Sequence, residues 1–291
     1  MTLNKDRTYI PCAELAPRLK IGEGEVVLLT SDVLRLAMRA RRGEGGFSSE
    51  KFIEGFITQI GSEGTLLIPA YNFDLETGDR FDIRKTQPMT GSLALAAMNL
   101  PAFCRTAHPL HSFLVAGNDA SRLCAMKNNS SFGPDSPFAY LMEKNALMVF
   151  VGTTPAEAMT FVHFVEESEQ VWYRKYKNIS LHYTAAGGTS SRRTYSLFAK
   201  KKGWTMKLHL LQEKLKQGNL TETEFNGVPV FTIRCAEAYD IISKDIREHA
   251  AAGIAGFSTG LYLRDTIKEA AVRLKIFRTL YGRIRSGKRT G

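Results

Sequence analysis

Val26-Val-Leu-Leu29 and Thr65-Leu-Leu-Ile68 are two short, continuous apolar runs, and each predicts a buried β-strand. Two segments with helical features separate them. The first, Val33 to Arg39, follows Thr30-Ser-Asp32, whose small polar side chains are typical of helix caps. The second places apolar residues at helical spacing between Phe52 and Ile60. This order predicts an α/β fold with a mostly parallel central sheet and helices on both faces.

Two further apolar runs, Phe113-Leu-Val-Ala116 and Leu147-Met-Val-Phe-Val151, predict two more strands. Later in the chain, Ile179 to Thr184 and Arg193 to Phe198 alternate in polarity and flank a turn-rich segment, which indicates an antiparallel hairpin. We expect one α/β domain over residues 1–291. Within it, residues 179–235 are a candidate antiparallel C-terminal lobe, and residues 269–291 are expected to form a basic helix and tail.

The composition is that of a soluble globular protein: 44% of the 291 residues are hydrophobic and 23% are charged. No apolar run approaches the ~18 residues that span a bilayer, and the first residues lack the apolar region of a secretory signal, so we expect a cytoplasmic protein. Cys12, Cys104, Cys124 and Cys235 are far apart and form no C-x-x-C pair. A disulfide framework or a zinc site is therefore not expected, and Cys104 is interpreted as a small buried residue.

The formal net charge of +10 is unevenly distributed along the chain. After Glu269 there are seven basic residues and no acidic ones: Arg273, Lys275, Arg278, Arg283, Arg285, Lys288 and Arg289. Lys200-Lys-Lys202 is a smaller basic cluster. This balance favours anionic partners such as phosphates, nucleotides, acidic glycans or an anionic membrane surface, and it disfavours a polycationic substrate.

The segment His163-Phe-Val-Glu166 follows the predicted strand that ends at Val151, after a break at Gly152-Thr-Thr-Pro155. Residues three apart share one face of a helix, so Glu166 can orient the imidazole of His163 and stabilise its protonated form. A histidine held in this way is suited to removing a proton from an amine or an alcohol. On spacing alone, an ordinary solvated ion pair is the more common meaning of such a pattern.

Several segments in order resemble the aminoglycoside 3-N-acetyltransferase family of coenzyme A-dependent enzymes. The resemblance covers about Ala13 to Asn178. It is carried by these stretches: Lys20 to Asp32, with the pattern of a first strand and turn; Gly61 to Asn72, like G-x-x-G-T-L-x-x-P; Arg105-Thr-Ala-His-Pro-Leu-His-Ser-Phe113, like R-S-x-H-P-x-x-S-F; Ser136-Pro137; and Gly152 to Glu166, ending in H-x-x-E. Each motif alone is weak, but together they favour a catalytic His163 and Glu166.

The resemblance implies transfer of an acyl group from acetyl-coenzyme A or another acyl-coenzyme A to an amine, without a covalent acyl-enzyme and without a metal. His163 would accept or relay the proton of the amine, and Glu166 would fix its tautomer. Ser112 is the candidate donor to the thioester oxygen. The predicted helix start at Thr30, Ser31 and Asp32 offers N–H groups for the coenzyme, and a plain helix cap is the alternative.

Other residues of the matching segments have weaker assignments. His108 lies in the best-matching motif as a candidate second catalytic imidazole, and a hydrogen bond to a loop carbonyl is its alternative. Tyr71 and Asn72, with Glu167, are candidates for the acceptor pocket, and packing in the core is the alternative for Tyr71. His111 receives no role. Thr30 stands where the family usually has His, and this departure makes the coenzyme contacts there less certain.

Three functions remain open. The favoured one is N-acylation of an amino sugar, nucleotide-linked or part of a polysaccharide precursor, because the basic surplus suits phosphorylated partners. The second function is N-acetylation of aminoglycosides. The third is a non-catalytic scaffold that contacts a membrane surface through the basic C-terminal helix. Nucleic acid is not an expected partner because no reading motif is present, and the sequence leaves an oligomer open.

Overall fold

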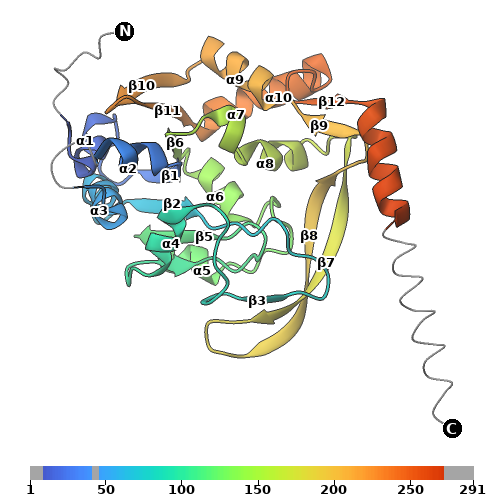
Figure 1. Ribbon diagram of the computed structural model, residues 1–291, viewed down its shortest axis with the longest axis horizontal. Helices are drawn as coiled ribbons and strands as arrows, with labels where there is room; N and C mark the ends of the chain where they lie inside the picture. Colours follow the sequence, from blue (N-terminus) through green and yellow to red (C-terminus); the bar gives the residue numbers. More distant parts are fainter. Residues whose placement is uncertain (1–8, 41–45, 272–291) are drawn as a thin grey trace.

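The computed structural model describes residues 9–40 and 46–271, and its centre is a sheet of seven strands in the order β10-β11-β6-β1-β2-β5-β4 (Figure 1). The central strand β1 (Val26–Ser31) is parallel to both neighbours, β2 (Thr65–Pro69) and β6 (Leu147–Val151). The outer strands are antiparallel to their neighbours; they are β5 (Phe113–Gly117), β4 (Cys104–Arg105), β11 (Val228–Arg234) and β10 (Thr221–Phe225). The predicted α/β class is confirmed, and the parallel part of the sheet is its middle.

Helices cover both faces of this sheet, because side chains alternate along each strand. Val27 and Leu29 point into one core and Val26 and Leu28 into the other. The first core includes the helices η1 (Cys12–Glu14), α1 (Leu15–Arg18), α2 (Leu34–Ala40), α3 (Ser49–Ile60) and α4 (Ser92–Met98). The second includes α5 (Ala120–Ala125), α6 (Pro137–Glu143), α8 (Phe161–Ser168), α9 (Leu208–Gln217) and α10 (Cys235–His249). These layers are visible on the two sides of the sheet in Figure 1.

Local signals explain where several elements begin and end. Ser48 caps α3 by accepting a hydrogen bond from the Lys51 N–H, and Ser136 caps α6, whose first residue is a proline. Strand β6 ends at Gly152, which has a φ of 70°. A Cβ atom there would lie 2.2 Å from the carbonyl oxygen of Asp32, so only glycine allows β1 and β6 to approach so closely.

A second sheet packs beside the first and carries the predicted hairpin. It contains β3 (Arg80–Asp82), β7 (Arg174–Thr184) and β8 (Ser190–Lys200), with β7 and β8 antiparallel over their full length. A two-stranded sheet joins β9 (Trp204–Met206) to β12 (Ala255–Phe257). Residues 179–235 are thus divided: the hairpin belongs to this second sheet, whereas β10 and β11 extend the central one.

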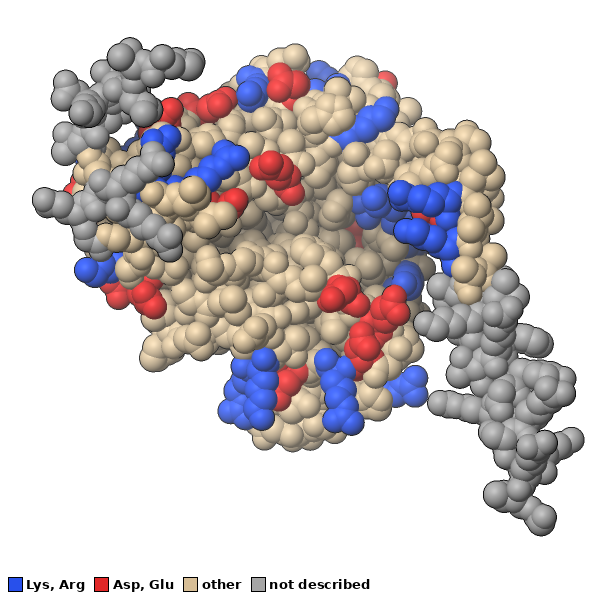
Figure 2. All heavy atoms as spheres, in the orientation of Figure 1, with Lys and Arg blue, Asp and Glu red and all other residues tan. Residues whose placement is uncertain are grey.

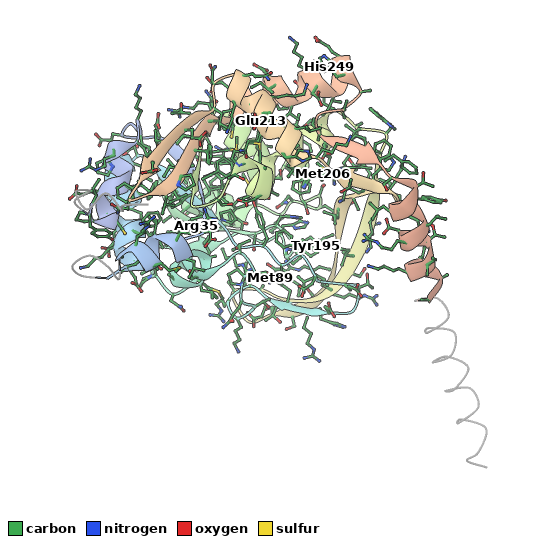
Figure 3. All side chains as sticks on the ribbon, turned by 45° about the horizontal axis from the view of Figure 1, so that its top comes forward. Arg35, Met89, Tyr195, Met206, Glu213 and His249 are labelled. Carbon is green, nitrogen blue, oxygen red and sulfur yellow. A yellow bond between two sulfur atoms is a disulfide. The ribbon has the colours of Figure 1, made fainter. Side chains whose placement is uncertain are left out.

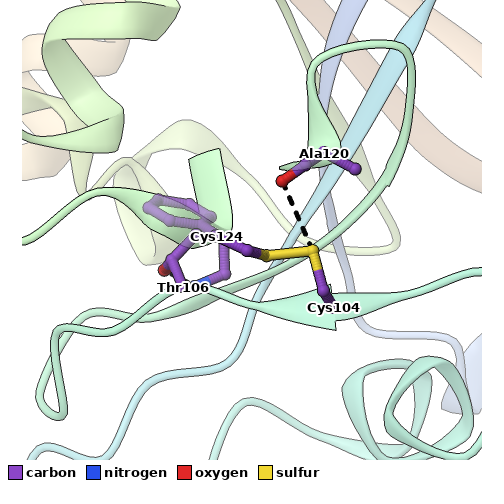
Figure 4. The surroundings of a disulfide bond; sticks show 5 residues. Cys104, Thr106, Ala120 and Cys124 are labelled. Carbon is purple, nitrogen blue, oxygen red and sulfur yellow. Dashed lines mark hydrogen bonds between the residues drawn. A yellow bond between two sulfur atoms is a disulfide. The ribbon is translucent and has the colours of Figure 1, made fainter. Parts of the chain in front are cut away.

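The expectation that the chain lacks a disulfide was wrong. Cys104 of β4 and Cys124 of α5 are bonded, with their Cα atoms 6.3 Å apart, as Figure 4 shows. They are 20 positions apart in the sequence, so no short motif indicates the pair. They meet because β4 runs antiparallel to β5, and α5 follows β5 and folds back over β4.

The last described residues, 259–271, form a helix that lies apart from the central sheet (Figure 1). Most of the basic helix and tail expected at 269–291 lies outside the described residues, which end at 271. Among the helices of the described part of the chain, none has the length and apolar character that crossing a bilayer would require.

Candidate active site

His163 lies on the first turn of α8, close to the carboxyl end of the parallel strand β6. After Gly152, a short helix α7 (Pro155–Ala158) begins where the Glu157 carboxylate accepts hydrogen bonds from the backbone N–H and the hydroxyl of Thr154. Helix α8 starts three residues later and buries its apolar side chains in the core. This sequence of turn, short helix and helix brings the imidazole to the edge where ligands commonly bind in α/β proteins.

Glu166 holds the ring of His163, as the three-residue spacing predicts. The distance from His163 Nδ1 to Glu166 Oε2 is 2.7 Å, and the carboxylate is completely buried. The other carboxylate oxygen, Oε1, accepts a hydrogen bond of 2.7 Å from the buried Tyr173 hydroxyl. Both oxygens of Glu166 are therefore engaged, and its position is fixed.

Arg174 completes the group and determines the tautomer of His163. Its terminal NH2 group lies 2.8 Å from Glu166 Oε2 and 2.8 Å from His163 Nδ1. An unprotonated Nδ1 would face the carboxylate lone pairs at hydrogen-bond distance, so the proton belongs on Nδ1 and Arg174 donates to Glu166. The second ring nitrogen, Nε2, makes no hydrogen bond within the described part of the chain and is free to accept a proton.

The surroundings keep His163 neutral near pH 7. Burial and the positive charge of Arg174 lower the pKa of His163, and the bond to Glu166 offsets only part of that shift. Burial alone would raise the pKa of Glu166, but the hydrogen bond from His163 and the charge of Arg174 hold that pKa below its usual value. The pair is therefore a neutral base beside a permanent carboxylate.

His163 opens onto a cavity of about 320 Å³ between α8 and the β7–β8 hairpin. Its side chain is 24% exposed there. The cavity is lined by Phe73, Leu110, His111, Phe132, Thr160, His163, Arg174, Leu197, Phe198, Ala199, Lys200 and Met206. Met206, labelled in Figure 3, belongs to β9. Figure 2 shows the molecular surface hollowed near its middle, with basic side chains gathered beside the helix at 259–271.

A second cavity, of about 230 Å³, adjoins the first, because both are lined by Phe73 and Thr160. It lies at the carboxyl ends of β1 and β2 and includes Leu29, Thr30, Ser31, Asp32, Ile68, Pro69, Tyr71, Thr90, Leu93, Thr153, Glu157 and Ala158. The three predicted coenzyme residues and Tyr71 therefore line a cavity that shares Phe73 and Thr160 with the cavity of His163.

The helix after β1 does not begin at Thr30, Ser31 and Asp32, where the sequence predicted a helix start. Thr30 and Ser31 are the last residues of β1, and α2 begins only at Leu34. Asp32 accepts a hydrogen bond from the Leu34 N–H through its side chain. Thr30 and Ser31 therefore face the second cavity from the end of a strand, and helical N–H groups at these two positions are not available.

Ser112 and Asn72 are buried residues that accept hydrogen bonds from Arg105. The Ser112 hydroxyl donates to the Ala70 carbonyl at 2.7 Å and accepts from Arg105 Nε, and the residue is fully buried. Asn72 accepts from Arg105 and donates to the Gln87 carbonyl. Neither residue lines the two cavities. Arg105 is thus the buried centre that holds these loops together, and its role was not predicted.

His108 and Glu167 also lie behind the cavity wall. His108 is fully buried, and burial lowers its pKa to about 3. Its Nε2 lies 3.3 Å from the Ser131 hydroxyl, which lies 2.9 Å from Nδ1 of His111. The Ser130 hydroxyl donates its one proton to the Glu167 carboxylate, with Oγ 2.6 Å from Oε1 and 2.9 Å from Oε2. His111, to which the sequence assigned no role, is the member of this group that lines the cavity.

The functional residues that sequence reasoning missed are Arg174, Tyr173, Lys200 and His111. Arg174 is one of three cations that follow Glu166 within a few positions, and nothing local distinguishes it from Lys175 or Lys177. It is 5% exposed, whereas Lys175 and Lys177 point to solvent. The alternation of strand β7 could have suggested this difference, but not which face is buried.

An α/β fold with a carboxylate-braced histidine in a cavity at the sheet edge defines a class of enzymes that use a general base. The family model for aminoglycoside 3-N-acetyltransferase matches residues 40–247, so the chain belongs to that family and is an N-acetyltransferase-type enzyme, as the motifs indicated. A search of curated proteins gives no significant match.

Several solved structures share the fold. Aminoglycoside acetyltransferase AAC(3)-Xa is 19% identical, with 82% of this chain and 92% of that chain covered and a TM-score of 0.68. AAC-IIIb, solved with CoASH, is 18% identical over 87% and 99%, with a TM-score of 0.70. The YokD protein from Bacillus subtilis is 18% identical over 80% and 96%, with a TM-score of 0.65. At these identities the likeness establishes the fold.

Proposed function

We propose that this enzyme transfers an acyl group from acetyl-coenzyme A, or another acyl-coenzyme A, to the amine of an amino sugar. The acceptor in this proposal is a nucleotide-linked sugar or a polysaccharide precursor. The observation that carries it is the neutral His163, whose Nδ1 bonds a buried Glu166 at 2.7 Å while its ring lines a cavity. His163 and Glu166 are the proposed catalytic residues.

The chemistry requires a base because an alkylammonium has a pKa of about 10 and cannot attack while protonated. The ammonium first loses one proton to solvent, and His163 Nε2 accepts a second proton from the nitrogen as the neutral amine bonds to the thioester carbon. The carbon–sulfur bond then breaks, and the sulfur leaves as the thiol of coenzyme A after taking up a proton. Glu166 stabilises the imidazolium that exists between these two proton transfers. No cysteine lines the cavity, which favours direct transfer over an acyl-enzyme.

The second cavity is the proposed place for the pantetheine arm of the coenzyme. Its walls are largely apolar, and Thr30, Ser31 and Thr153 add hydroxyl groups that can bond an amide. It meets the first cavity at Phe73 and Thr160, so a thioester there would face His163. The related AAC-IIIb, solved with CoASH, supports the choice of coenzyme. Tyr71 stays a candidate acceptor contact at this junction.

The test is release of coenzyme A thiol from acetyl-coenzyme A with a panel of nucleotide-linked amino sugars, followed by mass spectrometry of the products. Wild-type enzyme should yield an acetylated sugar. The His163→Ala variant should lower kcat by about 10²–10⁴-fold, the range for loss of a general base. His182→Ala, at an exposed position of β7, is the matched control and should keep wild-type activity. Absence of thiol release with every amine would reject the proposal.

Aminoglycosides are the second candidate acceptors. The family description and the solved neighbours, including one in complex with a gentamicin, favour them, and Asp32 and Glu157 provide acidic side chains in the second cavity. Expression of the wild-type chain in a susceptible bacterium, compared with His163→Ala, would raise tolerance to kanamycin or gentamicin if this candidate is correct. Unchanged tolerance together with acetylation of a nucleotide-linked sugar would favour the first proposal.

A further inference from the structure

We propose that the acceptor carries a carboxylate or phosphate group, and that Lys200 and Arg174 bind this group inside the cavity that contains His163. The inference rests on the proposed function and deepens it, because it names a specificity-determining pair and the chemical class of the acceptor. Three features support it: the charges that line the 320 Å³ cavity, the register of the β7–β8 hairpin and the Nε donor of Arg174, which has no hydrogen-bond partner.

The first observation is the absence of acid from the cavity lining. Of the residues that line it, Arg174 and Lys200 carry full positive charges, and none is Asp or Glu. Glu166 lies beneath the wall, but it is completely buried and already pairs with Arg174. A polycationic acceptor would meet two cations and no accessible carboxylate in this cavity, whereas an anionic acceptor would meet complementary charge.

The second observation is that these two cations face each other directly. Arg174 begins β7, Lys200 ends β8, and the two residues are register partners in the antiparallel hairpin. Like charges at directly opposite positions destabilise a sheet, because their side chains point to the same face. Burial and the charge of Arg174 together lower the pKa of Lys200. The carboxylates of Glu166 and Asp265 offset part of this lowering of the pKa. No ion pair within 4.0 Å among the described residues includes Lys200, so its ammonium group has no direct carboxylate partner there.

The third observation is an unsatisfied donor on Arg174. The side chain is 5% exposed. One terminal nitrogen donates to the Phe198 carbonyl and the other contacts Glu166, but Nε is buried without a hydrogen-bond partner. A buried guanidinium N–H that bonds nothing is uncommon in native proteins. An oxyanion bound between Lys200 and Arg174 would supply the missing negative charge at this place.

The anionic group is assigned to the acceptor because the same cavity contains the base. The amine must reach His163, so the anion bound by Lys200 lies within the dimensions of this cavity from the reacting nitrogen. In coenzyme A the long pantetheine arm separates the phosphates from the sulfur, and a cavity of this volume does not hold both ends. The coenzyme phosphates are the alternative source of the anion, and kinetics can separate the two.

The kinetic test compares glucosamine, glucosamine 6-phosphate and 2-amino-2-deoxyglucuronic acid as acceptors at low salt. At least one anionic sugar should have a kcat/KM ten or more times that of glucosamine. Lys200→Met should remove this preference by raising KM for the anionic acceptor. Lys175→Met is the matched control: it removes the same charge from the neighbouring position of β7, whose side chain is exposed, and should keep the preference.

Three outcomes would overturn the inference. Glucosamine or kanamycin could be the best acceptor, or Lys200→Met could leave the preference unchanged. The variant could also raise KM for acetyl-coenzyme A and leave that of the acceptor as it was, which would assign the anion to the coenzyme.

Calorimetric titration with glucose 6-phosphate, which lacks the amine, tests the site without catalysis. Saturable binding that is lost in Lys200→Met and kept in Lys175→Met supports the anion site even if no amine is acetylated, and absence of binding contradicts it. Failure of the proposed function, in contrast, is absence of thiol release with every acceptor. The two failures can therefore be distinguished.

Discussion

At the scale of single residues, the hydrogen bond to Nδ1 decides which nitrogen of His163 can act as a base. Glu166 and Arg174 together place the proton on Nδ1 and leave Nε2 for the substrate. Tyr173 does not line the cavity, but its hydroxyl donates a hydrogen bond to Oε1 of Glu166. Tyr173 is therefore a positioning residue that acts through Glu166.

Tyr173→Phe should lower kcat about tenfold, because a hydrogen bond to a buried charged group contributes about 1.5–3 kcal/mol. The KM for acetyl-coenzyme A should change little, since Tyr173 lines neither cavity. Steady-state kinetics measure both constants. Tyr176→Phe is the control, because that side chain is 51% exposed and its hydroxyl donates to Glu167 at 3.4 Å instead of to Glu166. An unchanged kcat in Tyr173→Phe would show that Glu166 needs no second donor.

His108 makes the stability of the fold depend on pH. Burial lowers its pKa to about 3, whereas an unfolded histidine titrates at about 6.5. Between these values the unfolded chain binds one more proton than the folded chain, so stability falls as the pH falls through this window. From pH 7 to pH 5 the loss from this group should be about 2 kcal/mol.

Urea unfolding at pH 7 and pH 5 measures this loss. His108→Asn removes the titrating ring and should reduce the difference between the two pH values, even if the variant is less stable at both. An equal difference in wild type and variant would show that His108 does not remain neutral in the folded protein.

At the scale of elements, the β7–β8 hairpin delivers the charged residues of the cavity. Its ends bring Arg174 and Lys200 together opposite α8, although 26 positions separate them in the sequence. The carboxyl ends of β1 and β2 provide the second cavity in the same way. The two adjacent cavities are therefore lined by different sheets, the first by the β7–β8 hairpin and the second by the ends of β1 and β2.

The disulfide between β4 and α5 should contribute about 3 kcal/mol to stability, the value that chain entropy gives for a loop of this length. Dithiothreitol should lower the unfolding free energy of wild type by this amount. It should have no effect on a Cys104→Ala/Cys124→Ala variant. Activity should survive in both, because neither cysteine lines a cavity. Equal stability of reduced and oxidised wild type would contradict the prediction.

At the scale of the whole molecule, the positive charge is concentrated toward the end of the chain. The helix at 259–271 exposes Leu263 by 56% and Ile267 by 68%. The sequence after Glu269 adds seven basic residues and no acidic ones. Apolar and basic residues together are typical of segments that bind the surface of an anionic membrane. Peripheral membrane contact therefore remains a prediction, in addition to the proposed catalytic activity.

Sedimentation with vesicles that contain phosphatidylglycerol tests this contact. The full chain should bind at low salt and dissociate as salt is raised, because screening weakens attraction between separated charges. A chain that ends at Ala270 should not bind, but it should keep thiol release with its acceptor. Equal binding of both chains, or binding that is insensitive to salt, would contradict a role for the basic C-terminal segment.

The sequence alone predicted the main strands of the central sheet, the β7–β8 hairpin and the pairing of His163 with Glu166. Apolar runs such as 147–151, the Ser136-Pro137 cap and the alternation of the hairpin depend on neighbours in the chain, so they can be read locally. The His163–Glu166 pair belongs to the same category, because three residues on one helix set its geometry. The family was also identified from such local motifs.

Only the tertiary structure decided which distant side chains meet. The Arg174–Lys200 pair, the Cys104–Cys124 bond and the burial of Ser112 against Arg105 each join segments with no shared periodicity. Such contacts form when strands pair and layers close over a core, and their partners are fixed by register and packing across the sheets. For that reason the sequence predicted the His163–Glu166 pair, whereas the charge of the cavity beside it became evident only in the folded chain.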